Sequence, residues 1–112
     1  MQRINPDKSL EGIPCSIVAV SCALGYIPDD LPSLRYDGYA TLETANKFIR
    51  KYLSVKKRIY YKRGERPKLK ELNIDGKALV CVYGHMVYLD HDTYYSFFDN
   101  ADDDVVSIWL LK

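Results

Sequence analysis

One nearly continuous apolar run covers residues 15–24 and predicts a buried element near the start of the chain. Pro14 stands near the expected first helical position and Gly25 is available as the C-terminal cap, so we expect a helix of about three turns. Three residues of the run are β-branched, and a buried strand is the alternative that the pattern leaves open.

Between residues 42 and 53, apolar side chains recur every three or four positions, which predicts a second, amphipathic helix. Thr41 is a candidate N-cap, and Glu43 lies in the first turn. Arg50 and Lys51 lie toward the other end, where cations interact favourably with the helix dipole. The preceding segment, residues 26–40, is rich in Pro, Asp and Gly and predicts turns.

The remaining chain predicts a sheet. Extended segments are expected at residues 55–62, 77–83, 86–89, 93–98 and 105–111, with a short helix over residues 67–74. The charged first segment suits a sheet edge, the apolar second suits a central position, and residues 90–92 suit a hairpin turn. The expected layout is α+β, with two helices and a mostly antiparallel sheet of about four strands, in one domain over residues 1–112.

Composition narrows the functional classes. The chain has 112 residues, 47% of them apolar, with ten tyrosines, enough for a packed core. No signal-peptide region or membrane-length apolar stretch occurs, so we expect a cytoplasmic protein with no membrane partner. Three cysteines without C-x-x-C spacing argue against a disulfide framework or a zinc knuckle. Without a glycine-rich phosphate loop, we expect no cofactor.

Charge is unevenly distributed along the chain. Residues 1–70 hold fourteen Lys and Arg against seven Asp and Glu, whereas residues 71–112 hold two against eight. Half of all Lys and Arg fall within residues 55–70, where they alternate with tyrosines. Candidate nucleic-acid contacts are Lys56, Lys57, Arg58, Tyr60, Lys62 and Arg63. The alternative is a charged edge strand that resists aggregation.

Cys15 is the strongest candidate for chemistry. At the start of a helix, a sulfur meets unpaired N–H groups and the positive end of the helix dipole, both of which favour the thiolate. Cys22 would lie in mid-helix and Cys81 in the central strand, and for both we expect the role of a small core hydrophobe.

His85, directly after Gly84, is the candidate general base for the thiol. A third group must orient its imidazole, and hairpin pairing would bring Asp99 back toward it. Asn100 is the alternative orienting residue, able to hold the ring without adding charge. The non-catalytic alternative is that His85 simply ends a strand and that Asp99 opens a solvated acidic loop that reaches Asp104. This loop lacks the pattern of a calcium site, so no metal is expected.

The order cysteine, histidine, then aspartate resembles small papain-like cysteine peptidases of bacteriophages and bacteria, and more loosely the peptidases that trim double-glycine leader peptides. The likeness rests on the Gly-His pair and hydrophobic strand of residues 84–90, the aromatic-Asp ending of residues 94–99, and the apolar helix that ends at Gly25. A final strand with Trp109 fits as well. The matching segments cover about residues 12–26 and 77–111.

The resemblance implies a papain-like fold and a thiol hydrolase that cleaves peptide or isopeptide bonds. It assigns Cys15 as nucleophile, His85 as general base and acid, and Asp99 as orienting residue. The family usually places a glutamine about six residues before the cysteine, where this chain has Ser9. Gln2 and Asn5 are therefore the oxyanion candidates, with the Cys15 backbone N–H. The alternative is a catalytically inactive papain-like protein that binds a host protein or nucleic acid.

Overall fold

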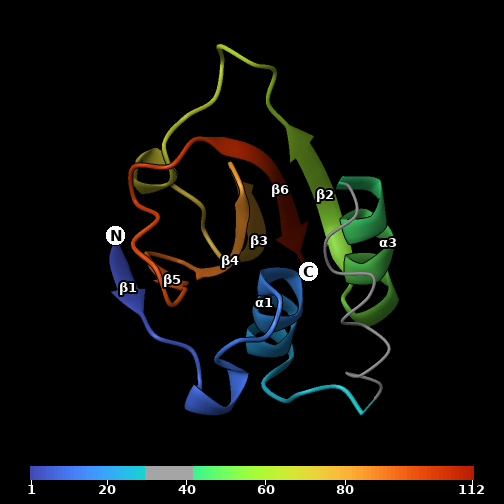
Figure 1. Cartoon of the computed structure of the whole chain (residues 1–112). Helices are drawn as coiled ribbons and strands as arrows, with labels where there is room; N and C mark the ends of the chain where they lie inside the picture. The colour runs from blue at the N-terminus through green and yellow to red at the C-terminus, as the bar shows by residue number, and fades with distance from the viewer. Residues whose placement is uncertain (30–41) are drawn as a thin grey trace.

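The computed structural model describes residues 1–29 and 42–112 of the chain. The elements are, in order, β1 (Gln2–Ile4), η1 (Lys8–Leu10), α1 (Cys15–Leu24), α3 (Leu42–Tyr52), β2 (Val55–Tyr60), η2 (Leu69–Glu71), β3 (Lys77–Val82), β4 (His85–Asp90), β5 (Thr93–Tyr95) and β6 (Val105–Leu111). They form an α+β fold, as the sequence predicts (Figure 1). Helices η1 and η2 are short 3₁₀ turns.

The apolar run near the N-terminus is a helix, so the strand alternative is wrong. In α1, Pro14 is the N-cap, and Gly25 ends the helix with φ 81°, a left-handed value that glycine adopts without steric cost. The Gly25 N–H donates to the Ser21 carbonyl. Six consecutive α1 residues, Ser16 to Ser21, are buried, which explains why the run shows no amphipathic spacing.

The sheet has six strands in the order β1-β5-β4-β3-β6-β2. All neighbouring strands pair antiparallel except β1 and β5, which pair parallel. Strand β3 is central and β2 lies at an edge, as the sequence predicts. The predicted count of about four strands is too low. The unpredicted β1 is three exposed residues without alternation, and it pairs with β5 through the backbone.

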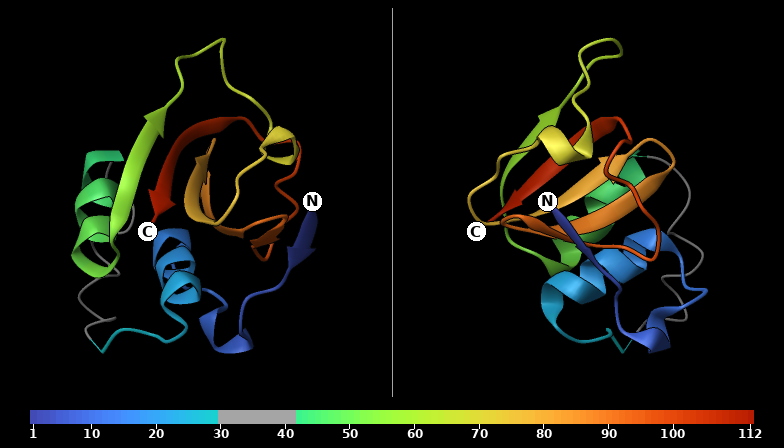
Figure 2. Two further views of the ribbon diagram at one scale, coloured as in Figure 1. Left: turned by 180° about the vertical axis from the view of Figure 1, so that it is seen from behind. Right: turned by 90° about the vertical axis from the view of Figure 1, so that its left-hand side faces the viewer.

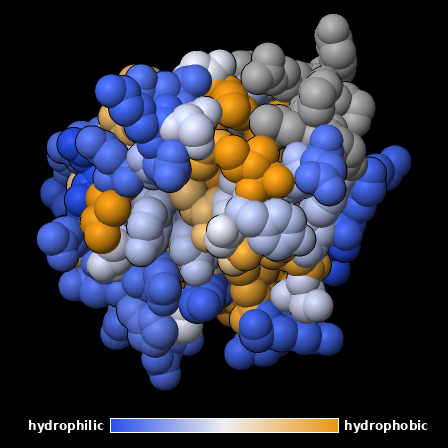
Figure 3. Space-filling model, turned by 90° about the horizontal axis from the view of Figure 1, so that it is seen from below, coloured by the Kyte–Doolittle hydropathy of each residue, from blue (hydrophilic) through white to orange (hydrophobic). Residues whose placement is uncertain are grey.

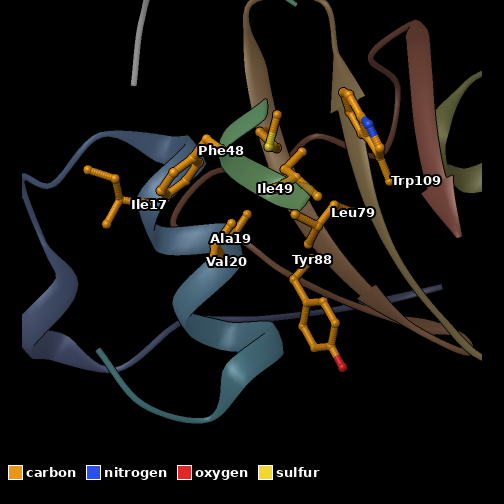
Figure 4. Packing of buried hydrophobic residues seen from close by; sticks show 9 residues of the cluster. Ile17, Ala19, Val20, Phe48, Ile49, Leu79, Tyr88 and Trp109 are labelled. Atoms are coloured by element: carbon orange, nitrogen blue, oxygen red, sulfur yellow. The ribbon is translucent and has the colours of Figure 1, made fainter. Parts of the chain in front are cut away.

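Helices α1 and α3 lie on one face of the sheet (Figures 1 and 2). That face and the helices share one apolar cluster, to which Ile17 and Val20 of α1, Ile49 of α3 and Leu79 of β3 belong (Figure 4). The opposite face carries a second cluster, covered by Leu69 of η2. Because α1 packs mainly against β4 in the first cluster, the start of this helix lies close to the strand that begins with His85.

Helix α3 confirms the predicted amphipathic helix, with Phe48 and Ile49 buried. Asn46 accepts a hydrogen bond of 2.9 Å from the indole N–H of the fully buried Trp109, which satisfies the polar atom of that side chain. The predicted N-cap Thr41 and most of the predicted turn segment, residues 30–40, lie outside the described residues.

Candidate active site

Cys15 and His85 line one open cavity of about 650 Å³. Its wall comes from four parts of the chain: the segment before α1, the first turns of α1, the β3–β4 turn with the start of β4, and the residues after β5. The lining residues are Asn5, Glu11, Gly12, Ile13, Pro14, Cys15, Val18, Gly84, His85, Met86, Tyr95, Ser96, Phe97 and Phe98. The fold thus brings together two of the three residues that the sequence assigns to a triad.

The Cys15 sulfur is surrounded by backbone N–H donors. The N–H groups of Met86, Ser16 and Cys15 itself all act on it and favour the thiolate. Burial has the larger and opposite effect and raises the pKa of the Cys15 thiol above its ordinary value. The other thiols lack this set of donors, and burial raises the pKa of Cys22 and of Cys81 to about 11. Cys15 is therefore the thiol best prepared for ionisation.

The His85 ring is held by Ser96. A distance of 3.2 Å joins His85 Nε2 to Ser96 Oγ. The Ser96 hydroxyl donates its own proton to Asn100 Oδ1, 2.6 Å away, so it must accept from Nε2–H. This assignment puts the lone pair on Nδ1, which has no hydrogen-bond partner within residues 1–29 and 42–112. Nδ1 is the nitrogen that is free to act as a base.

The chain of hydrogen bonds continues from Asn100 to a carboxylate. Asn100 is 5% exposed and donates from Nδ2 to Asp103 Oδ2 at 2.7 Å. Asp103 also favours protonation of His85 electrostatically. The connection His85–Ser96–Asn100–Asp103 therefore links the imidazole to a negative charge through two neutral side chains. We call these four residues the relay.

Within residues 1–29 and 42–112, no hydrogen bond or ion pair joins Asp99 to His85. Asp99 Oδ1 accepts from the Tyr94 hydroxyl at 3.1 Å and from the Ala101 N–H at 3.1 Å. The same Tyr94 hydroxyl accepts from the Asn100 N–H. Asp99 thus fixes the loop that carries Asn100. The alternative orienting residue, Asn100, reaches His85 only through Ser96.

Burial also lowers the pKa of His85, with Asp103 opposing that effect. The exposed ring of Phe98 stands edge-on to the imidazole, with centroids 5.5 Å apart and planes at 90°. A raised thiol pKa and a lowered imidazole pKa mean that both groups are neutral at pH 7. In the described part of the chain, no hydrogen bond joins Cys15 to His85, a separation that is common in substrate-free sites.

Asn5 lies at the rim of the cavity because β1 pairs with β5. The Arg3 guanidinium donates to Asn5 Oδ1 and, at 3.2 Å, to the Ser96 carbonyl. The bond from Arg3 fixes the orientation of the Asn5 side-chain amide. Its Nδ2 group therefore remains able to donate to a ligand. Gln2 pairs with Thr93 and is not part of the cavity wall, and Ser9 bonds Asp7 instead.

The predicted nucleic-acid residues lie elsewhere, on edge strand β2 and the segment after it. Arg58 is turned inward: its guanidinium stacks 5.0 Å from the Trp109 ring centroid and pairs with Glu43. The others in this set are exposed.

Two relay residues, Ser96 and Asp103, had no role in the sequence interpretation. Ser96 stands as a small polar residue inside the aromatic stretch of residues 94–98, and its burial at 2% exposure is the signal that such a position carries a hydrogen-bond role. Asp103 is one of several aspartates in an acidic loop, and the pattern does not separate it from its neighbours.

No group of three or more His, Cys, Asp or Glu side chains in the described residues has an arrangement that could hold a metal ion. Among the same residues, no helix has the length and apolar character needed to cross a bilayer. No family model, curated protein or solved structure matches this chain.

Proposed function

We propose that this chain is a papain-like thiol hydrolase that cleaves peptide or isopeptide bonds through a Cys15 thioester. The observation that carries the proposal is the shared cavity, in which a helix N-terminal thiol bonded by the Met86 N–H faces the same space as His85. The relay behind His85 supports it, because it fixes the tautomer that a general base needs.

The first step starts from a neutral pair. As the sulfur attacks the carbonyl carbon, the thiol proton moves to His85 Nδ1, and a C–S bond forms while the carbonyl electrons move to oxygen. Asn5 Nδ2 and the Cys15 backbone N–H are the donors for that oxyanion. The new imidazolium keeps Nε2–H on Ser96, and its charge is balanced by Asp103 through the relay.

In the second step the tetrahedral intermediate collapses. The C–N bond breaks, His85 Nδ1 returns its proton to the departing amine, and an acyl thioester remains on Cys15. A water molecule then attacks the thioester while His85 takes one of its protons. The C–S bond breaks, the acid product leaves, and the Cys15 thiol is restored with the proton from His85.

A second cavity of about 540 Å³ extends the binding surface along α1 toward its C-terminal end. The two cavities share Asn5 and Tyr95 and therefore adjoin each other, and we take the two together as the path of an extended chain. On the lower face of the molecule, toward the C-terminal end of α1, apolar side chains gather centrally between hydrophilic surfaces (Figure 3). A peptide or protein segment fits such a path better than a small compact substrate.

The test is selective alkylation. At neutral pH in the folded protein, iodoacetamide should label Cys15 much faster than Cys22 and Cys81, as measured by peptide mass spectrometry. His85→Ala should slow the labelling of Cys15. His91→Ala is the matched control, because His91 is exposed in the β4–β5 turn and should leave the rate unchanged.

Two results would contradict the proposal. One is equal reactivity of the three cysteines, appearing only on unfolding. The other is a Cys15 rate that does not depend on His85. Either result would favour an inactive papain-like protein that binds a host protein.

A further inference from the structure

The basic segment of residues 55–70 divides into two parts in the folded chain. Lys68 bonds Asp104 at 2.6 Å and Lys70 bonds Asp102, so the acidic loop neutralises the end of the segment. Four exposed cations have no ion pair within residues 1–29 and 42–112. We call them the basic edge: Lys56, Lys57, Lys62 and Arg63.

The basic edge follows the free edge of the sheet. Lys56 and Lys57 belong to β2, which pairs only with β6. Lys62 and Arg63 follow in a turn closed by the Glu65 N–H to Lys62 carbonyl bond of 2.9 Å. This segment stands away from the body of the molecule at the top of Figure 1. Glu65 is the single acidic residue among residues 55–66.

An exposed aromatic ring lies within the basic edge. Tyr60 is the last residue of β2 and is 57% exposed, between the lysines of the strand and those of the turn. Its neighbour Tyr61 is partly buried against the second apolar cluster. Unpaired cations precede and follow Tyr60 along the chain. On the surface the ring lines a shallow hollow with Arg58 and Glu43, whereas Lys56 lines another hollow with Ile59 and Tyr61. A tyrosine with more than half its surface in water offers a ring face on which a flat group can stack.

We propose that the basic edge and Tyr60 bind single-stranded nucleic acid. The cations contact successive phosphates while Tyr60 stacks on an unpaired base, which a duplex would not supply. The surface is separate from the candidate active site, because β2 lies at the opposite edge of the sheet from β1 and β5. The proposal therefore stands or fails independently of thiol chemistry.

The experiment measures binding of a fluorescein-labelled dT12 oligonucleotide to the full chain by anisotropy, from 50 to 200 mM NaCl. Four phosphate contacts on a single strand give a slope of about −3 when the logarithm of the association constant is plotted against the logarithm of the salt concentration. Binding should therefore weaken about 50-fold over this range. Tyr60→Ala should weaken binding by about 5- to 150-fold, and Tyr60→Phe should restore most of it.

Charge variants distinguish binding by the basic edge from general attraction of the oligonucleotide to the net charge of the protein. Lys56→Ala with Lys57→Ala should reduce the salt slope by about 1.4, since each lost phosphate contact on a single strand removes about 0.7. The matched control is Lys68→Ala with Lys70→Ala, which removes the same charge from positions that Asp104 and Asp102 already neutralise. This control should change affinity far less.

Three outcomes would overturn the proposal. The first is absence of binding at 50 mM salt with a folded protein. The second is equal loss in the two double variants, which would indicate attraction to net charge. The third is equal affinity for dT12 and for an abasic oligomer of the same length, which would remove the role of Tyr60 stacking.

Discussion

His85 and Ser96 are joined through Nε2 and Oγ at 3.2 Å, and this bond connects the start of β4 with the residue after β5. Because the Ser96 hydroxyl donates onward to Asn100, it can only accept from the imidazole. One serine therefore determines that the free lone pair of the imidazole lies on Nδ1.

Replacing Ser96 should show whether the relay or Asp99 orients the imidazole. In the proposed hydrolase, Ser96→Ala should slow Cys15 alkylation near neutral pH by up to about 100-fold, the lower range of a general-base contribution. The alkylation rate of Ser96→Ala, measured against pH, should also lose the inflection near the His85 pKa. Ser96→Thr keeps the hydroxyl and should recover much of the rate. Asp99→Asn is the comparison: a larger loss there than in Ser96→Ala would contradict this assignment.

Stability should depend on pH through His85. Burial lowers its pKa below the ordinary 6.5, so the unfolded chain takes up a proton at a higher pH than the folded one. The free energy of unfolding should therefore fall as pH drops through 6.5 and level off below the folded-state pKa. Urea titrations of the wild type and His85→Gln between pH 8 and 5 would measure this.

In that series, the stability of His85→Gln should decline less than that of the wild type. Asp7 and Asp102 do not interfere, since their pKa values are already lowered from 3.8 and titrate below the range. Parallel curves for wild type and His85→Gln would show that His85 does not contribute.

Arg58 should stabilise the fold. Its guanidinium stacks on the fully buried Trp109, and its Nε donates to Ser107 Oγ at 3.3 Å. Arg58→Ala should lower the free energy of unfolding by about 1–2 kcal/mol, and Arg58→Lys should recover only part, because ammonium lacks the planar stack. Glu43→Gln, which removes an exposed ion pair, should change stability by no more than about 1 kcal/mol. Denaturant unfolding with Trp109 fluorescence measures all three.

Gly84 should be needed for the geometry of His85. It has φ 79° in the turn between β3 and β4, a conformation that costs an L-residue about 1–2 kcal/mol. An added Cβ would meet no atom within 4 Å, so backbone strain is the whole effect. Gly84→Ala should lower stability by about that amount and slow Cys15 labelling. Gly84→Asn, which tolerates this conformation better, should be milder; equal stability of Gly84→Ala and wild type would contradict the argument.

The sequence identifies those parts of the fold that depend on local pattern. The amphipathic helix follows from its hydrophobic spacing and the last strand from its apolar run. For residues 15–24 only Pro14 and Gly25 favour a helix, since the apolar run itself is equally compatible with a buried strand. Strand β1 does not follow from local pattern, because three exposed residues carry no spacing and their pairing is made by backbone atoms far along the chain.

The sequence likewise identifies some residues of the candidate site and not others. Cys15 and His85 can be found from residue type and position relative to an expected helix and strand. The role of Ser96 cannot, because it depends on how residues 96–103 turn after β5. That turn is built by side-chain bonds such as Tyr94 to Asp99 and Asn100 to Asp103. Asp99 stands fourteen positions after His85, and this spacing alone does not specify which carboxylate is linked to the ring.

The parallel pairing of β1 with β5 has a consequence for folding kinetics. Ile4 pairs with Tyr95, so the rim residue Asn5 reaches the cavity only after a loop of about ninety residues has closed. Such long-range pairing is slow, because chain entropy is lost before the contact forms. During synthesis on the ribosome, Cys15 and its helix emerge well before β4 and β5. A partly made chain therefore lacks His85 and does not yet hold Asn5 in place, so the Cys15 thiol acquires its surroundings only when β4 and β5 assemble.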